Sequence, residues 1–466
     1  MPQQTSKHQM RTFFVIWFGQ LISTIGSGLT GFALGVWVYQ QTGSTTLFAL
    51  NMLAYTLPNL LVAPFAGALV DRWDRRKVMM LSDSGAGLST LTLLILLVTG
   101  RLAVWHIYLI TACNAAFSTF QWPAYSAVTT LLVPKSQLGR AGGMVQIGEA
   151  ISQLISPAVA GAMFMRTGLQ GIALVDFATY AFALLTLLAV RLPKPITTQE
   201  GLAGRGSLIE EALYGWKYIR ARAGLLGLLV IFALSNFLAS LVNPLITPMF
   251  LDMTTPAVLG YLASILGLGM LVGTVVMSAW GGPKRRIHGV LGFSMLSGLL
   301  IALFGLRPSI PFMAVVGFAL MFTMPIINGS SQALWQSKVA VDVQGRVFAV
   351  RRMMAMSAIP LAYLSAGPLA DQVFKPLLIE GGPLANSVGR ILGVGPSRGI
   401  GLMFVLIGIL NILVVGSGYL HPRVRNVEDE LPDAVIEKGS QAEALEKTSR
   451  TAQPREATDS HLTPAD

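Results

Sequence analysis

Residues 67–77 read GALVDRWDRRK, a short basic turn that separates two long apolar stretches. Gly67 has no side chain, so two helices could approach closely at this point. Asp71 ends the first stretch, where an acid can cap the positive N-terminus of a neighbouring helix. Arg75 and Arg76 can each hold a carboxylate through paired donors. We expect a latch that holds in one conformation and breaks in another, formed by Gly67, Asp71, Arg72, Arg75 and Arg76.

The apolar character on both sides of this turn extends through the whole chain. Of its 466 residues, 53% are hydrophobic and 12% are charged, about half the charged share of a soluble domain. A soluble core could not hide so much apolar surface, whereas a lipid bilayer removes the need to hide it. A helix needs about 20 apolar residues to cross the hydrocarbon. Twelve such stretches are predicted, at roughly 12–39, 45–70, 78–99, 103–133, 141–165, 169–190, 224–250, 257–280, 288–306, 311–336, 347–371 and 399–420.

The basic residues gather in alternate loops. Of the 33 Lys and Arg residues, 21 lie in the N-terminal segment and in every second loop after it, and six lie in the other loops. The positive-inside rule therefore predicts that both termini are cytoplasmic, in a protein of the bacterial inner membrane. The net charge of +11 is explained by this orientation and does not indicate nucleic-acid binding.

The twelve stretches divide six plus six about a long central loop. This division predicts an all-α membrane protein with an N-terminal six-helix half at 1–191 and a C-terminal six-helix half at 224–420. The loop 192–223 is expected to be a cytoplasmic linker with an amphipathic helix, lying on the membrane surface or serving as a plain linker helix. The charged tail, 421–466, is expected to be disordered.

The position of the basic turn after the second of twelve spans supports a family resemblance. The turn resembles the G-x-x-x-D-R-x-x-R-R signature of the major facilitator superfamily of transporters. Softer motifs resemble the drug:proton antiporter branch that contains bacterial macrolide-efflux-type exporters; they lie at 120–124, 132–134, 175–177, 344–347 and 367–371. The resemblance implies two six-helix halves and export in exchange for protons by alternating access. Two motifs depart from the family pattern, since 156–161 is degraded and the second-half basic turn, 281–286, has no acid.

Two carboxylates lie deep in predicted spans and are candidates for proton coupling, because ionisable groups at membrane depth are costly. Glu149 lies about 12 Å along its helix and Asp176 about 10 Å along the next. Each could take a proton from one side and release it to the other. Alternatively, Gln146 and Gln153 could satisfy Glu149, and Asp176 could anchor helix packing. Three further acids are expected to be interfacial, at helix ends: Asp83, Asp252 and Asp371.

The resemblance also implies a substrate cavity near the midplane between the halves, lined by the first, fourth, seventh and tenth helices. These helices carry aromatic side chains, including Phe18 and Phe232, and neutral polar ones that could instead form interhelical hydrogen bonds. With no Lys or Arg expected among them, the cavity suits amphipathic or weakly cationic drug-like molecules. The polar candidates are Gln20, Asn114, Gln121, Asn236, Asn243, Asn328 and Gln332.

Other functions find less support in the residues. No catalytic Ser or Cys motif, zinc motif or close acidic pair lies in the spans, which argues against a membrane enzyme. The sequence has one cysteine, Cys113, and no nucleotide-binding loop, so we expect no metal, no cofactor and no use of ATP. Two alternatives stay open, a specific exporter of a metabolite such as a siderophore or lysolipid, and a scaffold or sensor acting through the tail. We expect a monomer whose partners are the bilayer, protons and a small-molecule substrate.

Overall fold

The computed structural model describes residues 2–134, 137–190, 216–339 and 343–431, and its regular elements are all helices. The side chains of 2–8, 64, 67, 68, 71, 72, 139, 345 and 349 are not described. The long helices are α1 (Pro2–Thr42), α2 (Thr45–Arg72), α3 (Arg75–Val98), α4 (Val104–Leu132), α5 (Leu138–Ala189), α8 (Ala223–Leu251), α9 (Pro256–Trp280), α10 (Arg286–Leu306), α11 (Ile310–Lys338), α12 (Gln344–Pro368) and α15 (Pro396–Leu420). The short ones are η2 (Leu369–Phe374), α13 (Lys375–Leu377), α14 (Gly389–Leu392), α16 (Pro422–Arg425) and α17 (Val427–Glu430).

Ten of the described helices are long and apolar enough to cross a membrane. One of them, α5, contains two helices, 138–167 and 169–189, because Gly168 between them adopts φ 61° and ψ −166°. The more polar α4 has 29 residues, which extend about 44 Å and can also cross the hydrocarbon. The described residues thus contain twelve spans, and the predicted all-α membrane fold is confirmed. The helix ends agree with the predicted ends to a few residues, except that α1 begins at Pro2.

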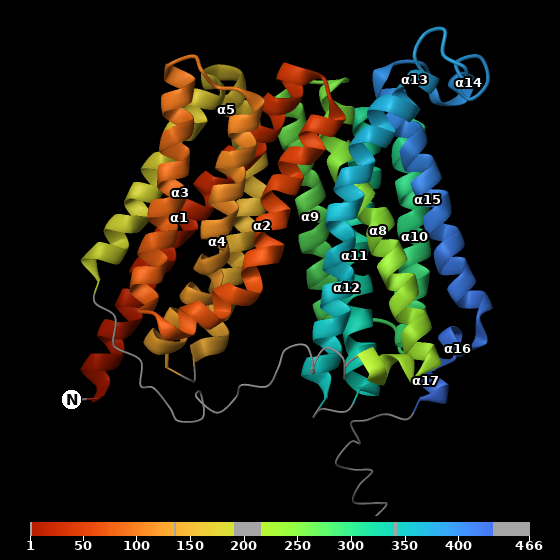
Figure 1. Ribbon diagram of the computed structural model, residues 1–466. Helices are drawn as coiled ribbons and strands as arrows, with labels where there is room; N and C mark the ends of the chain where they lie inside the picture. Colours follow the sequence, from red (N-terminus) through yellow and green to blue (C-terminus); the bar gives the residue numbers. More distant parts are fainter. Residues whose placement is uncertain (1, 135–136, 191–215, 340–342, 432–466) are drawn as a thin grey trace, which may run out of the picture.

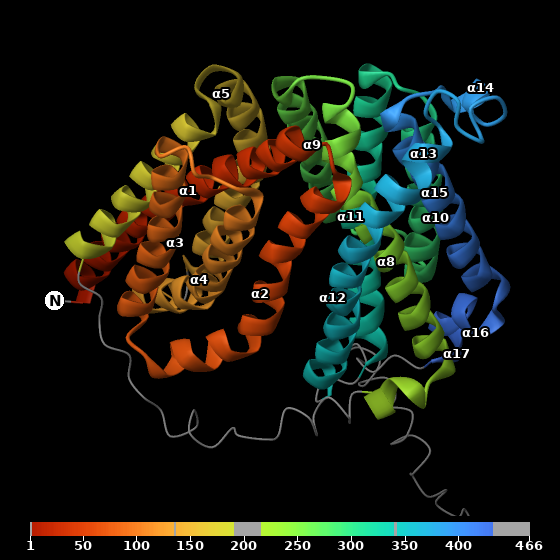
Figure 2. The same cartoon turned by 45° about the horizontal axis from the view of Figure 1, so that its top comes forward.

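The helices form two curved rows, one from each part of the chain (Figures 1 and 2). In the first half, α1 to α5, the packing order is α2, α4, α3, the second helix of α5, α1 and the first helix of α5. In the second half, α8 to α15, the order is α12, α8, α15, α10, α11 and α9. The rows join end to end, because α2 packs on α12 and α5 packs on α9. The inner faces of both rows therefore face one another.

Small residues allow the two halves to approach closely, as is common in membrane bundles. A Cβ added at Gly161 of α5 would collide with the carbonyl of Pro256 in α9. Likewise, a Cβ at Gly260 of α9 would collide with the carbonyl of Pro157 in α5. At the other junction, Gly367 of α12 lies against the backbone of Thr46 in α2.

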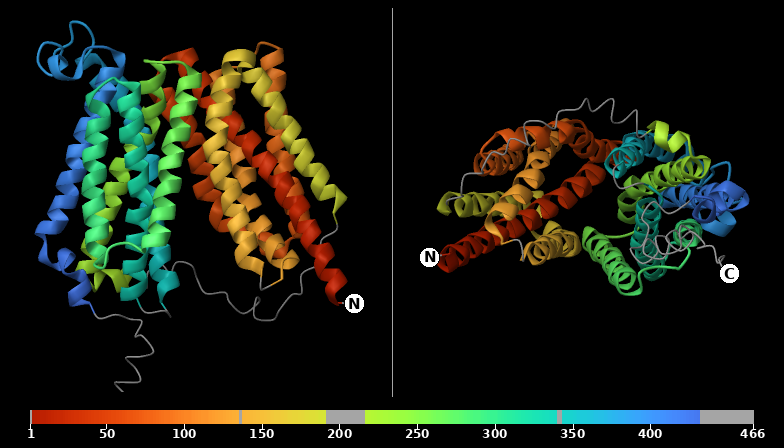
Figure 3. Two further views of the ribbon diagram at one scale, coloured as in Figure 1. Left: turned by 180° about the vertical axis from the view of Figure 1, so that it is seen from behind. Right: turned by 90° about the horizontal axis from the view of Figure 1, so that it is seen from below.

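The two ends of the bundle differ. The N-terminus, the basic turns and α16 and α17 lie at one end, here called the basic end, which is at the bottom of Figure 1. The loop around Gly168 and the segment with α13 and α14 lie at the other, here called the opposite end (Figures 1 and 3). The interface contacts of Gly161, Gly260 and Gly367 all lie in the half of the bundle nearer the opposite end.

The expectation that 421–466 is disordered was wrong for its first part. Residues 421–431 form α16 and α17 and pack beneath α8 and α10, where Val424 is 2% exposed and Val427 is fully buried. The Nζ of Lys338, at the end of α11, donates hydrogen bonds to two backbone carbonyls of this segment. The rest of the tail lies outside the described residues, as does most of the predicted linker 192–223. This packing could not be predicted, because the segment is short and highly charged.

The folded start of the tail supplies the acid that the second-half basic turn lacks. The Glu428 carboxylate accepts hydrogen bonds from the N–H groups of Arg286, at 2.8 Å, and Ile287, at 3.2 Å. These are the first two residues of α10, so Glu428 caps its positive N-terminus. Arg285 lies 3.6 Å from the Asp429 carboxylate. The basic turn is therefore completed by residues about 140 positions away in the chain.

We expect Glu428→Ala to lower the thermal unfolding midpoint of the purified protein in detergent. The variant leaves two N–H groups at the start of α10 without acceptors, and the loss of a helix cap costs about 1 kcal/mol. Glu430→Ala is the matched control, because Glu430 is exposed in the same helical turn and no side-chain contact is recorded for it. Equal midpoints for the two variants would contradict the capping role.

Candidate functional site

The basic turn 67–77 joins α2 to α3 at the basic end. The side chains of Gly67, Asp71 and Arg72 are among those not described, so their part in the latch stays a prediction. A neighbouring acid, Asp74, caps α3 by accepting hydrogen bonds from the N–H groups of Arg76, at 2.9 Å, and Lys77, at 3.3 Å. Asp is a preferred N-cap residue, so its position directly before the helix was a signal that the sequence analysis missed.

Arg76 binds backbone carbonyls and not the carboxylate expected of it. Its Nε donates to the carbonyl of Leu187 at 3.0 Å, and its Nη2 donates to that of Leu188 at 3.1 Å. These carbonyls lie in the last turn of α5, where a cation is favoured by the helix macrodipole. The Nε of Arg75 is buried and has no hydrogen-bond partner among the described side chains. The turn thus ties the start of α3 to the end of α5.

Asp176 is fully buried inside the first half. It lies on the second helix of α5, and its Oδ2 accepts a hydrogen bond from Thr90 of α3 at 3.0 Å. Its Oδ1 has no hydrogen-bond partner among the described residues. The carboxyl group also lies against Gly26 of α1. Asp176 therefore joins three helices at a point where only one of its oxygens is satisfied.

Asp83 is also buried, so the expectation of an interfacial position was wrong. It is 5% exposed and lies within α3, about 12 Å along that helix. Its Oδ2 accepts a hydrogen bond from Gln20 at 2.9 Å, and its Oδ1 accepts one from Gln121 at 3.1 Å. The Nε2 of Gln121 also donates to the Oε1 of Gln20 at 2.7 Å. These three side chains form a closed polar cluster between α1, α3 and α4.

Glu149 differs from both aspartates because it is partly exposed. It lies on the first helix of α5 and makes no hydrogen bond to any described residue, so the Gln146 and Gln153 side chains do not satisfy it.

The predicted cavity residues have different surroundings in the two halves of the protein. In the first half, Gln20 and Gln121 are held in the Asp83 cluster, and Asn114 donates to the Tyr180 hydroxyl at 3.3 Å. In the second half, the polar candidates keep exposed or partly exposed side chains; they are Asn236, Asn243, Asn328 and Gln332. The lining role of the whole set stays a prediction.

One basic side chain contacts a predicted cavity residue, although no cluster of Lys or Arg was expected there. Arg351 falls within the predicted span 347–371, and the structure places it in α12, which begins at Gln344. It binds the predicted cavity residue Gln332 of α11.

A carboxylate of the second half joins the two halves at the opposite end. Asp371 of η2 accepts hydrogen bonds from the Ser44 hydroxyl, the Thr45 N–H, and both the N–H and the hydroxyl of Thr46, at 2.8–3.1 Å. Ser44 is the N-cap of α2, so Asp371 caps a helix of the other half. Lys375 lies 3.0 Å from the same carboxylate.

A second cross-half contact lies beside it. The Tyr39 hydroxyl of α1 donates to Asp252, which follows α8, at 2.6 Å, and Lys375 donates to the same hydroxyl at 3.4 Å. We call these residues the clasp: Tyr39, Ser44, Thr45, Thr46, Asp252, Asp371 and Lys375. Asp252 and Asp371 do lie at helix ends as expected, but their partners are in the other half.

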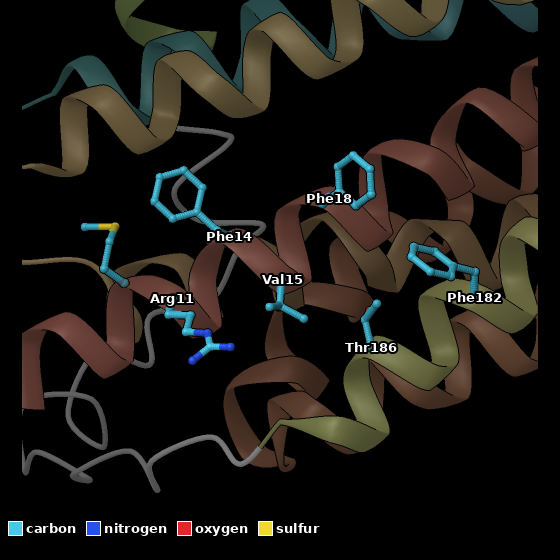
Figure 4. A pocket seen from close by; sticks show the side chains of 7 residues that line it. Arg11, Phe14, Val15, Phe18, Phe182 and Thr186 are labelled. Atoms are coloured by element: carbon cyan, nitrogen blue, oxygen red, sulfur yellow. The ribbon is translucent and has the colours of Figure 1, made fainter.

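A groove of about 650 Å³ lies on the surface of the first half, between α1 and the second helix of α5 (Figure 4). Its lining is apolar except for Arg11 and Thr186. Phe18, which was expected near the cavity, lies here and packs edge-on against Phe182. No lining residue comes from the second half, so this groove is separate from the space between the halves.

Comparison with known proteins agrees with this architecture. The model of the family described as the Major Facilitator Superfamily matches residues 16–363. The chain belongs to the major facilitator superfamily. It is therefore a multi-pass membrane protein and a secondary transporter of a small-molecule substrate, not an enzyme.

Relatives of this transporter include drug exporters. Macrolide efflux protein A of Streptococcus pyogenes is 29% identical over 365 residues, which cover 78% of this chain and 90% of the relative. Multidrug efflux pump Tap of Mycolicibacterium fortuitum is 28% identical over 374 residues, covering 77% and 88%. The crystal structure of a bacterial homologue of the human lysosomal transporter Spinster, inward-facing and unoccupied, superposes with a TM-score of 0.69 at 12% identity, covering 91% of this chain and 98% of that one. The last similarity concerns the fold alone.

We expect Asp371→Asn to open the opposite end of the transporter. The change removes the charge that strengthens the hydrogen bonds at the start of α2, and such bonds each contribute about 1.5–3 kcal/mol. The open fraction should therefore rise roughly tenfold or more, since about 1.4 kcal/mol corresponds to a factor of ten. Distances between spin labels on Gln41 and Glu380, both exposed at this end, would measure it after Cys113→Ser.

Asp429→Asn is the matched control, because Asp429 is an exposed acid at the basic end. The clasp has no gating role if the distance distributions of the two variants are the same.

Proposed function

We propose that this transporter exports hydrophobic or amphipathic drug-like compounds across the bacterial inner membrane in exchange for protons. The observation that carries the proton coupling is the pair of buried carboxylates in the first half. Asp83 and Asp176 are 5% and 0% exposed, and neither has a Lys or Arg partner among the described residues. The direction and the substrate class rest on the printed names of the relatives, a macrolide efflux protein and a multidrug efflux pump.

Buried acids without cations suit proton transfer for an electrostatic reason. An ionised carboxylate at membrane depth is costly, so its neutral form competes with its charged form. Glu149 is exposed enough to exchange protons with water and substrate, whereas Asp83 and Asp176 are enclosed. We assign proton exchange at the cavity to Glu149. We assign to Asp176, and now also to Asp83, the linkage between protonation and helix packing.

The orientation follows from the positive-inside rule. If the basic end faces the cytoplasm, the clasp lies on the outer side, and the described conformation is closed to the outside. A substrate would then enter from the cytoplasm between the two halves, 1–191 and 224–420, which move as units. Drug-like molecules dissolved in the inner leaflet or the cytoplasm would meet this opening first.

Two aspartates could stabilise the two closed states in turn. α2 and α12 pack side by side and run in opposite directions. Asp371, just beyond the end of α12, caps the start of α2 on the outer side. Asp71 lies near the end of α2, at the same end of the bundle as the start of α12, and we assign to it the capping of that helix when the cytoplasmic side closes. If one cap forms as the other breaks, the two closed states would be nearly equal in free energy.

Ethidium extrusion from preloaded, drug-hypersensitive bacterial cells tests the function. We expect cells that express the protein to lose ethidium faster than empty-vector cells, and we expect a protonophore to remove the difference. Protonophore-resistant extrusion would contradict proton coupling. A membrane-inserted protein without any extrusion of ethidium or a macrolide would contradict polyspecific export.

Neutral variants test each acid separately. We expect Glu149→Gln, Asp83→Asn and Asp176→Asn each to bind drug with near wild-type affinity but to reduce uphill export at least tenfold, because a side chain that cannot release a proton cannot couple to the gradient. Glu380→Gln is the control, since Glu380 is an exposed acid beyond α13. An acid whose variant still concentrates drug against a gradient has no part in coupling.

A further inference from the structure

Arg351 is a cation placed inside the second half. It lies seven residues after the start of α12, about 10 Å along the helix axis. Its Nη1 donates to Oε1 of Gln332 at 3.1 Å, and its Nη2 donates to the hydroxyl of Ser331 at 2.9 Å. Both partners are on α11. The guanidinium is thereby held in one position by two hydrogen bonds.

Two aromatic rings surround the guanidinium. Its Cζ lies 5.4 Å from the ring centroid of Phe232 in α8 and 5.4 Å from that of Trp335 in α11. Both distances are within the range of cation–π attraction. Trp335 is 1% exposed and forms part of the packed core of this half. The buried Trp335 therefore fixes the position of the cation, whereas Phe232 is partly exposed and could accept the apolar body of a ligand.

The charge of Arg351 is not neutralised within the described part of the chain. The ion pairs recorded there join Arg285 to Asp429 and Lys375 to Asp371. A guanidinium has five N–H donors, and the contacts of Arg351 use two of them. Charged groups at membrane depth are costly and usually mark a substrate pathway. An anion that reached Arg351 would find both the charge and free donors.

Arg351 joins two helices of the second-half row and keeps part of its side chain exposed. α12 packs on α8 and α2, whereas α11 packs on α9 and α10. Arg351 of α12 therefore makes its hydrogen bonds to a helix that is not its neighbour in the row. The junctions of α2 with α12 and of α5 with α9 close the two rows around their inner faces. Arg351 is partly exposed and Gln332 is exposed. A ligand between the halves can therefore contact both.

We propose that Arg351, Gln332 and Phe232, supported by the buried Trp335, form a binding site for an anionic group on an apolar, aromatic body. The ligand class is an amphipathic carboxylate, or a zwitterion that carries one. Arg suits this role because its planar fork binds a carboxylate through two parallel hydrogen bonds. The inference rests on the proposed transport of amphipathic compounds and narrows the substrate class, extending it beyond the neutral and cationic drugs that a cavity without basic residues would favour.

Two dyes that differ only at the carboxylate test the site. Rhodamine B has a free carboxylate, and its ethyl ester has the same aromatic body without that charge. Fluorescence anisotropy with the purified full-length protein in detergent gives both dissociation constants. We expect the wild-type protein to bind rhodamine B roughly tenfold more tightly than the ester. Equal affinity for the two dyes would overturn the proposal without the use of any variant.

Variants then locate the preference. We expect Arg351→Gln to weaken rhodamine B binding about tenfold and to leave the ester unaffected, and we expect Arg351→Lys to have an intermediate effect. Arg352→Gln is the matched control, because it removes the same charge from the next, exposed residue. Equal weakening of both dyes by Arg351→Gln, or loss of the preference in Arg352→Gln, would overturn the assignment.

The binding measurement is independent of protons and of export. Ethidium extrusion by wild-type cells and by the control variant Arg352→Gln shows separately whether the transport cycle works, because this cation has no carboxylate for Arg351. If wild-type cells extrude no ethidium while the purified protein still prefers rhodamine B, then the export proposal fails and the anion site stands.

Discussion

The contact on which this conformation depends is the Asp371 carboxylate at the start of α2. It receives four hydrogen bonds from residues of the first half, including two N–H groups that have no partner within their own helix. The close packing at Gly161, Gly260 and Gly367 then holds the two rows together on the same side.

The interior charges are divided between the two halves. The first half contains the acids Asp83, Asp176 and Glu149, and the second half contains Arg351 on an aromatic surface.

Much of the fold could be predicted because the bilayer imposes it. Helices about 20 residues long, a basic turn after the second span and alternating basic loops are all readable along the chain. The acids were harder to place. Asp83 lies a few residues from the basic turn, and only its contacts with Gln20 and Gln121 reveal that it is buried. Arg351 falls inside a predicted span, and only its hydrogen bond to Gln332 reveals that it contacts α11.

The sequence by itself determined the helical membrane fold, the number of spans and the family, since each depends on hydrophobicity and on motifs that are local in the chain. The tertiary structure decided which polar groups meet. Glu428 caps α10 from a distance of about 140 residues, Asp371 caps a helix of the other half, and Arg351 reaches Gln332 across the inner face. These contacts depend on which helices pack together, and no local pattern encodes that, because lipid-facing and partner-facing sides of a spanning helix are both apolar.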